Sequence, residues 1–160
     1  MRNDILSLLE HNAKLTPEEI SVRLGLPEAE VRSEITKMEE EQIICGYCAC
    51  INWENAGSDF LTALIEVKVT PARGQGFNKI AGRIARFDEV KAVYLMSGGY
   101  DLSVIVEGNS LKEISLFVSD KIASLESVLS TTTHFVMKTY KNHRIIFEQD
   151  GGDERMIVSP

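Results

Sequence analysis

The chain has few of the sequence features that are typical of secreted or membrane proteins. Its 160 residues include only three cysteines, Cys45, Cys48 and Cys50, and an odd number in so short a stretch predicts no disulfide framework. The longest apolar stretch, residues 60–69, is interrupted by polar and charged side chains and is too short to span a bilayer. The N-terminus lacks the pattern of a secretory signal. We therefore expect a cytoplasmic globular protein.

Basic residues are also scarce. The chain has 17 Lys and Arg against 24 Asp and Glu, a formal net charge of −7. Residues 1–42 carry five basic and ten acidic side chains, a net charge of −5. This sign is the opposite of what phosphate contacts favour. A nucleic-acid interface in this segment would therefore gain little affinity from charge alone.

Motifs that carry catalysis or bind metals are missing from the sequence. We find no pairing of a nucleophile with a base, no metal-binding triad and no phosphate-binding loop. The three cysteines form C-x2-C-x-C without a fourth ligand, and a strand would send Cys45 to the opposite face from Cys48 and Cys50. We expect them to be small buried hydrophobic side chains, and His134 to be a core or interface residue. The chain is predicted to be no enzyme and to need no cofactor or metal.

The first segment predicts three helices. Thr16, Pro17 and Glu19 form a capping box with proline at the first helical position. Gly25 ends that helix, and a third helix begins directly after it, near Pro27. Two short helices joined by a tight glycine turn form a helix-turn-helix. Residues 43–51 have the composition of a strand, which we interpret as a β-ribbon wing.

The second segment alternates between strand and helix patterns. Strands are expected at 60–69, 90–97, 101–107 and 128–140, and helices near 77–84 and 111–125. The order βαββαβ is the ferredoxin-like layout. The fold class is therefore α+β, an N-terminal winged helix-turn-helix followed by a ferredoxin-like domain. The expected boundaries are 1–52 for the first domain, 53–59 for a linker, 60–143 for the second domain and 144–160 for an acidic tail.

Both helices of such a domain cover one face of the sheet, and the other face must meet water or a partner. Either alternate set from the strand at residues 90–96 would give that face more apolar residues than a wet surface normally has. We expect a dimer built sheet against sheet or edge to edge.

Several loose motifs in a characteristic order carry a family resemblance. They are residues 24–32, Ile43-Ile44, Gly46-Tyr47, Gly57, residues 98–102 and residues 128–133. Over residues 3–142 the chain resembles the Lrp/AsnC (feast/famine) family. The resemblance implies a winged helix-turn-helix that binds double-stranded DNA and a βαββαβ (RAM-type) domain that binds an amino acid or related small molecule. It also implies homodimers that assemble into octamers or larger rings. Gln42 stands where relatives have a glycine.

Two sets of site residues follow. The outer face of the third helix is expected to contact DNA through Glu28, Ala29, Arg32, Ser33, Thr36 and Lys37. The resemblance places the effector site at Met96, Gly98, Gly99, Tyr100, Asp101, Thr131, Thr132 and Thr133. Glycine N–H groups in the turn can bind a carboxylate, and Asp101 can pair with an ammonium group. With only Arg32 and Lys37 as cations on the helix, we expect weak DNA binding per monomer, recovered by multivalent oligomers.

Two other functions remain open at this point. The two-domain layout also resembles sirohaem decarboxylases, which would need basic and histidine residues around a porphyrin. Alternatively, the acidic helices could belong to a sensor or assembly module that has lost DNA binding. The leading hypothesis is a sequence-specific transcription regulator that responds to a small molecule.

Overall fold

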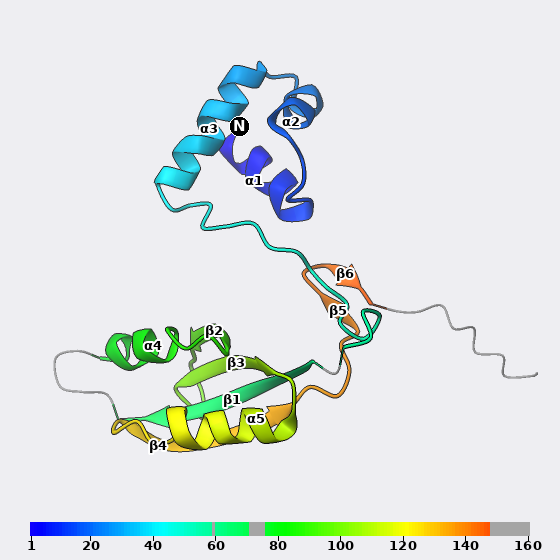
Figure 1. Ribbon diagram of the computed structural model, residues 1–160. Helices are drawn as coiled ribbons and strands as arrows, with labels where there is room; N and C mark the ends of the chain where they lie inside the picture. The colour runs from blue at the N-terminus through cyan, green and yellow to red at the C-terminus, as the bar shows by residue number, and fades with distance from the viewer. Residues whose placement is uncertain (59, 71–75, 148–160) are drawn as a thin grey trace, which may run out of the picture. The chain divides into compact units, whose positions relative to one another are not determined.

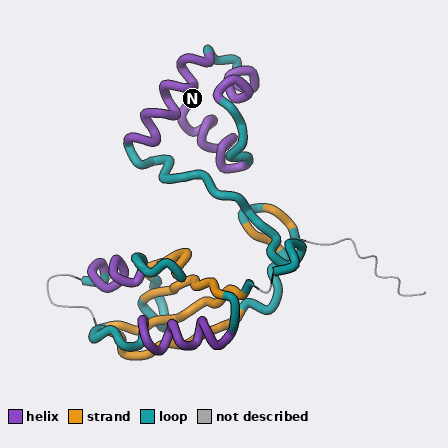
Figure 2. The backbone as a smooth tube through the Cα atoms, viewed as in Figure 1, coloured by secondary structure: helices purple, strands orange, loops and turns teal. Residues whose placement is uncertain are grey.

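The chain folds into two units. The computed structural model describes residues 1–58, 60–70 and 76–147 (Figures 1 and 2). One unit comprises Met1–Ile51 with the chain from Lys141 onward, and the other comprises Asn52–Tyr140. Within the described ranges, no helix combines the length and the hydropathy needed to cross a membrane.

The first unit contains the three predicted helices, α1 (Arg2–His11), α2 (Pro17–Leu24) and α3 (Glu28–Glu40). The capping box is confirmed, because Thr16 Oγ1 accepts from the Glu19 N–H and Glu19 Oε2 accepts from the Thr16 N–H. Gly25 ends α2 with φ +65°, a left-handed conformation that glycine adopts without a steric cost. The helix-turn-helix therefore follows from local sequence signals.

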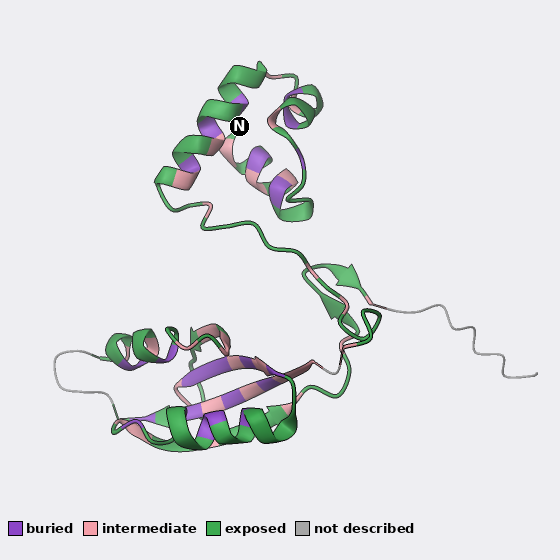
Figure 3. Cartoon of the chain, in the orientation of Figure 1, coloured by how far each residue is buried: buried purple, intermediate pink, exposed green. Residues whose placement is uncertain are grey.

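A small apolar core holds these helices together. It consists of Ile5, Leu9, Leu15, Ile20, Val31 and Met38, each 8% exposed or less. Val31 and Met38 lie on the inner face of α3, one repeat of the helical pattern apart. The inner face being fixed in this way, the opposite face of α3 is left to solvent (Figure 3).

An ionic network joins the start of α1 to the inner and C-terminal side of α3. The Arg2 guanidinium donates to the nearly buried Glu34 carboxylate, and to Glu41 with N–O distances of 2.7 and 3.0 Å. Hydrogen bonding to Arg2 holds the pKa of the Glu41 carboxyl below its usual range. The network satisfies Glu34, a charge that would otherwise be costly to bury.

The prediction of a β-ribbon wing at residues 43–51 is wrong, because the structure has no strand there. Gln42 adopts φ +56°, and the N–H groups of Ile43 and Ile44 both donate to the Met38 carbonyl, which ends α3. Residues 45–51 then run without helix or strand (Figure 2). Strand composition alone cannot make a ribbon, because a strand forms only where a second one supplies hydrogen bonds.

The cysteines in this segment do not behave as small core residues. Cys45 and Cys48 are exposed and Cys50 is half-buried, and all three are free thiols. The expectation of burial was wrong because the segment that carries them packs no face against a core. Among the described residues, no group of three His, Cys, Asp or Glu could hold a metal ion.

The second unit has the predicted βαββαβ order. Its strands are β1 (Leu61–Val69), β2 (Val90–Leu95), β3 (Leu102–Gly108) and β4 (Val128–Phe135). Its helices are α4 (Asn78–Ile84) and α5 (Leu111–Phe117), the latter continued by a π-helical turn, η1 (Val118–Ile122). The strands form one antiparallel sheet in the order β2-β3-β1-β4 (Figure 1).

Both helices cover the same face of this sheet. Alternate residues of β1 and β3 pack with the apolar sides of α4, α5 and η1 in a single core, whose completely buried members are Ala63, Ile65, Val67, Ile84, Leu102, Val104, Val106 and Ile122. The two central strands carry the most buried side chains (Figure 3). The opposite face, here called the open face, is covered by none of the helices in the described part of this unit.

The end of the chain departs from the prediction. The last strand of the sheet stops at Phe135 rather than Tyr140. A short hairpin follows, β5 (Lys141–Asn142) paired with β6 (Ile145–Ile146), where a tail was expected from residue 144. Its turn residues His143 and Arg144 have positive φ without being glycine, so the turn lacked the sequence signal that would have revealed it. The acidic residues 148–160 lie outside the described part.

Candidate functional site

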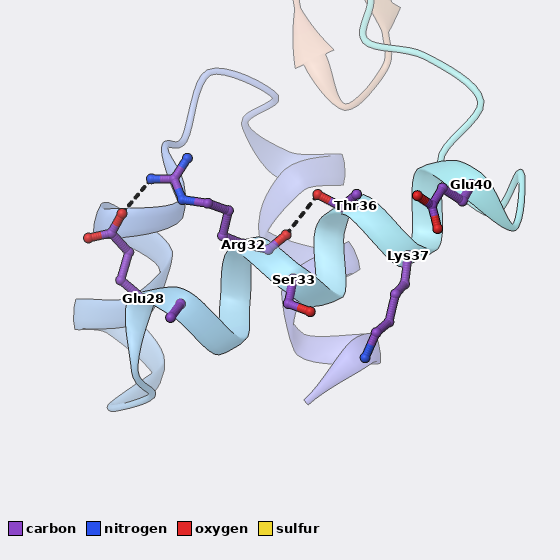
Figure 4. Close-up of a pocket in the computed structure, with 7 residues that line it drawn as sticks. Glu28, Arg32, Ser33, Thr36, Lys37 and Glu40 are labelled. Atoms are coloured by element: carbon purple, nitrogen blue, oxygen red, sulfur yellow. Dashed lines mark hydrogen bonds and ion pairs between the residues drawn. The ribbon is translucent and has the colours of Figure 1, made fainter.

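The six residues expected to contact DNA lie together on one surface. Helix α3 presents Glu28, Ala29, Arg32, Ser33, Thr36 and Lys37 to solvent, and they line a shallow depression that Glu40 closes at the C-terminal end (Figure 4). All seven side chains are exposed. The six residues expected to contact DNA, called here the α3 outer face, point away from the core of their own unit.

Both cations of the α3 outer face have a carboxylate partner. An Arg32 guanidinium nitrogen donates to Glu28 Oε1, one helical turn away. The Lys37 ammonium nitrogen lies 4.0 Å from Oε2 of Glu34. The outer face is consequently close to neutral, and the paired carboxylates weaken the attraction of Arg32 and Lys37 to phosphate groups.

Glu34 is the member of α3 that sequence reasoning missed. It is 8% exposed and is shared between Arg2 and Lys37. The signal was its position three residues after Val31 and four before Met38, which puts it beside the buried stripe of the helix. Its charge therefore does not lie on the α3 outer face, although a count by segment includes it.

Tyr47 anchors the extended segment after α3. Its hydroxyl donates to Glu39 Oε1 at 2.8 Å. Partial burial and this hydrogen bond raise the pKa of the Tyr47 phenol to about 12. Tyr47 thereby ties a segment without regular structure to the C-terminal turn of α3.

The turn between β2 and β3 is closed by backbone hydrogen bonds and by one carboxylate. The Met96 N–H donates to the Asp101 carbonyl at 2.8 Å. Gly98, at φ +156°, allows the chain to reverse in a conformation that other residues rarely adopt. Met96 and the glycines are exposed, whereas Tyr100 and Asp101 are half-buried.

Asp101 is fastened to strand β1. Its N–H donates to the Val67 carbonyl at 3.1 Å, and its Oδ2 accepts from the Val69 N–H at 2.9 Å. The register of β1 and β4 shifts between Lys68 and Val69. The Oδ2 atom of this carboxylate therefore has a structural partner that the sequence did not predict.

The three threonines of β4 do not form one group. Thr131 and Thr133 pair with Val67 and Ile65 and are half-buried on the helix-covered face. Thr132 pairs with Glu66 and is exposed on the open face. Strand alternation requires this division. Val67 nevertheless links the two predicted segments, because it accepts from Asp101 and lies opposite Thr131.

The open face of the sheet is mixed in character. Leu64 and Ile105 lie opposite each other at its centre. Beside them, His134 Nε2 lies 3.2 Å from Oε1 of Glu66. His134 is exposed, so a place in the core of its own unit is wrong. Tyr94, 56% exposed, extends the face onto β2.

Comparison with known proteins identifies the family. The sequence profile of the Lrp/AsnC ligand-binding domain matches residues 62–146, and that of a winged helix-turn-helix DNA-binding domain matches residues 2–44. The chain belongs to the Lrp/AsnC family. It combines a DNA-binding domain with a ligand-binding domain, the organisation of a transcription regulator. The predicted fold class, a helix-turn-helix followed by a ferredoxin-like domain, is confirmed apart from the strands of the wing.

Relatives agree with this assignment. The uncharacterized HTH-type transcriptional regulator YugG of Bacillus subtilis (strain 168) is 49% identical over 158 residues, which cover 98% of this chain and 95% of that protein. The uncharacterized HTH-type transcriptional regulator PF1734 of Pyrococcus furiosus is 33% identical over 137 residues, covering 86% and 89% of the two chains. Both similarities run through both domains.

Solved structures share the fold. A transcriptional regulator of Neisseria meningitidis in complex with L-methionine is 25% identical and superposes with a TM-score of 0.70, covering 88% of this chain and 90% of that one. A feast or famine regulatory protein of M. tuberculosis, also complexed with L-methionine, is 22% identical with a TM-score of 0.72, covering 89% and 94%. The second likeness concerns the fold alone.

The three histidines lie in three separate elements. His11 ends α1, His134 lies on the open face and His143 lies in the β5–β6 turn. The profile matches and the relatives' names favour the regulator over the decarboxylase alternative.

Proposed function

We propose that this Lrp/AsnC regulator reads double-stranded DNA with the α3 outer face and adjusts that binding to an amino acid held by the second unit. The proposed DNA-binding domain is 1–52 and the ligand-binding domain is 60–143. The observation that carries the proposal is the exposure of all six predicted DNA contacts on the second helix of a helix-turn-helix. Residues of such a helix reach base edges in the major groove.

The pairing of Arg32 and Lys37 with carboxylates predicts how this DNA binding behaves. Each phosphate that the protein leaves without a cationic partner makes the slope of log affinity against log salt shallower by about one unit. A monomer is therefore expected to bind weakly and with a shallow salt dependence. Two or more helix-turn-helix units on one DNA raise the affinity through effective concentration, so an oligomer is the proposed DNA-binding form.

The proposed effector is an α-amino acid. In support, the β2–β3 turn offers exposed backbone at Gly98 and Gly99 and a carboxylate at Asp101. Met96, 40% exposed, supplies an adaptable apolar wall. Two structural neighbours hold L-methionine. Thr131, Thr132 and Thr133 complete the proposed site, from the same chain or a neighbouring one.

The proposed assembly is a homodimer that forms octamers. The open face, with Leu64, Ile105 and Tyr94 beside Glu66 and His134, offers apolar surface that a second copy would cover. Light scattering on the purified full chain tests this directly. A monomer at every concentration would contradict it. No catalytic activity is proposed for the chain.

An electrophoretic mobility shift experiment tests DNA binding. The full chain is titrated onto the DNA upstream of its own gene at several salt concentrations, with and without amino acids. Arg32→Ala is expected to weaken binding, whereas Lys112→Ala, an exposed lysine on α5, is the matched control and should leave binding unchanged. No retardation at low salt by the wild type would refute the proposal.

Thermal shift with the twenty amino acids tests the effector. A ligand that binds only the folded state raises the melting temperature in proportion to the logarithm of its concentration. We expect a subset of amino acids to stabilise the second unit and Asp101→Asn to abolish that effect. If no amino acid does so, the effector is of another chemical class.

A further inference from the structure

A carboxylate at the start of the recognition helix is the feature of the α3 outer face that phosphate binding does not explain. Glu28 is the first residue of α3, and Pro27 precedes it as the N-cap. The N-terminal residues of such a helix are those that reach base edges. DNA presents a strongly negative surface there, so an acidic side chain opposes binding unless it accepts a hydrogen bond from a base.

Glu28 does not act alone, because Arg32 lies one turn further along the same face. Their side chains are joined by an ion pair, with exposed fractions of 45% and 63%. Figure 4 shows the Arg32 guanidinium turned back toward the Glu28 carboxylate. The pair thus presents a hydrogen-bond acceptor beside a set of donors, and each group limits the rotamers of the other.

The major groove contains a complementary pattern. In a C·G pair the cytosine N4 amino group is a donor, and the O6 and N7 atoms of the guanine are acceptors. Adenine also carries an amino group, but its N7 acceptor lies beside it and would repel the second carboxylate oxygen. A carboxylate with an adjacent guanidinium therefore matches cytosine and its paired guanine better than any other base pair.

We infer that Glu28 and Arg32 act as one unit that reads a single C·G base pair in each half-site, with Glu28 accepting from cytosine N4 and Arg32 donating to guanine O6 and N7. Glu28 is then a specificity-determining residue, not an electrostatic defect. The inference rests on the proposed function, since it assumes that the α3 outer face enters the major groove. Reversal of the base pair exchanges donor and acceptors, so the orientation of the pair is read as well.

The test starts from selection of binding sites from a random-sequence DNA pool by the full-length protein at low salt. The wild type is expected to enrich one C·G position per half-site. Replacement of that pair by T·A is expected to weaken binding about tenfold or more, the discrimination typical of a well-placed base contact. Glu28→Gln is expected to shift the preference at this position from cytosine to adenine, because glutamine pairs with adenine N6 and N7.

Glu40→Gln is the matched control. Glu40 is exposed on α3 beyond the six proposed DNA contacts, so this variant makes the same change of charge away from the N-terminal turn. It is expected to raise affinity for all sequences equally and to leave the base preference unchanged. Circular dichroism checks that both variants keep the helical content of the wild type.

The outcomes separate the two proposals. If Glu28→Gln keeps the cytosine preference, or changes affinity for all sequences equally as Glu40→Gln does, the inference is overturned while DNA binding stands. If the wild type selects sites without any C·G position, the inference is likewise overturned. If the wild type enriches no sequence and retards no DNA, the proposed function fails with it.

Discussion

Replacement of Asp101 by alanine removes the side-chain acceptor of the Val69 N–H, and nothing in the variant replaces it. The hydrogen bond is 2.9 Å long and partly buried, and it fastens the β2–β3 turn to the end of β1. A buried donor left without a partner costs about 1–3 kcal/mol. Because water reaches this site in part, the lower half of that range applies, about 1–2 kcal/mol.

This destabilisation is large enough to measure. For a domain of this size, 1 kcal/mol lowers the melting temperature by roughly 4–8 °C. Asp101→Ala is therefore expected to lower the melting temperature of the second unit by about 5–15 °C in differential scanning calorimetry. Asp101→Asn keeps a carbonyl oxygen for the Val69 N–H and should be destabilised less than half as much.

Asp88→Ala is the matched control, since Asp88 is an exposed carboxylate of the same unit. A surface substitution of this kind stays within about 0.5 kcal/mol of the wild type. If Asp101→Ala and Asp88→Ala have the same melting temperature, the hydrogen bond to Val69 does not stabilise the turn and the reasoning is refuted. If Asp101→Asn keeps both its stability and its response to amino acids, the ammonium pairing is wrong while the structural role stands.

Three further outcomes are expected. Arg2 lowers the pKa of the Glu41 carboxyl from its usual value of about 4.5 in the folded state. The ion pair with Arg2 therefore stabilises the fold above pH 4.5, and this stabilisation is lost as the pH falls through the lower pKa of the folded state. Glu41→Gln should make the free energy of unfolding depend less on pH in this acidic range. Met38→Ala, in the core of the first unit, should cost about 2–5 kcal/mol and abolish that unit's calorimetric transition, while the second unit still melts as in the wild type. In an absorbance titration one tyrosine should ionise near pH 12, and this phase should be missing in Tyr47→Phe and occur at lower pH in Glu39→Gln.

Local signals decided most of the fold. The capping box at Thr16, the turn at Gly25 and the spacing of Val31 and Met38 fix α2 and α3, because each signal depends only on residues within one or two turns of chain. The alternation of apolar residues in β1 and β3 likewise fixed which side of each strand faces the core. These patterns also predicted the candidate DNA-binding face, because it is the side of α3 opposite the buried residues Val31 and Met38.

What the sequence could not give was the partner of each polar group. It counted Glu34 among the acids of the recognition helix, whereas the fold buries it against Arg2. It assigned the carboxylate of Asp101 to a ligand and did not predict that Oδ2 accepts from the Val69 N–H of β1. Such pairings join residues about thirty positions apart, and no periodicity reports them.

The sequence by itself therefore determined the order of elements, the buried stripe of each one and, by exclusion, the face of α3 that meets solvent. Only the tertiary structure decided that Glu34 and Glu41 pair with Arg2, that Asp101 accepts from the Val69 N–H, and that residues 45–51 find no strand to pair with. The physical reason is that hydrophobic periodicity is a property of one segment, whereas a hydrogen bond or an ion pair needs two segments brought together.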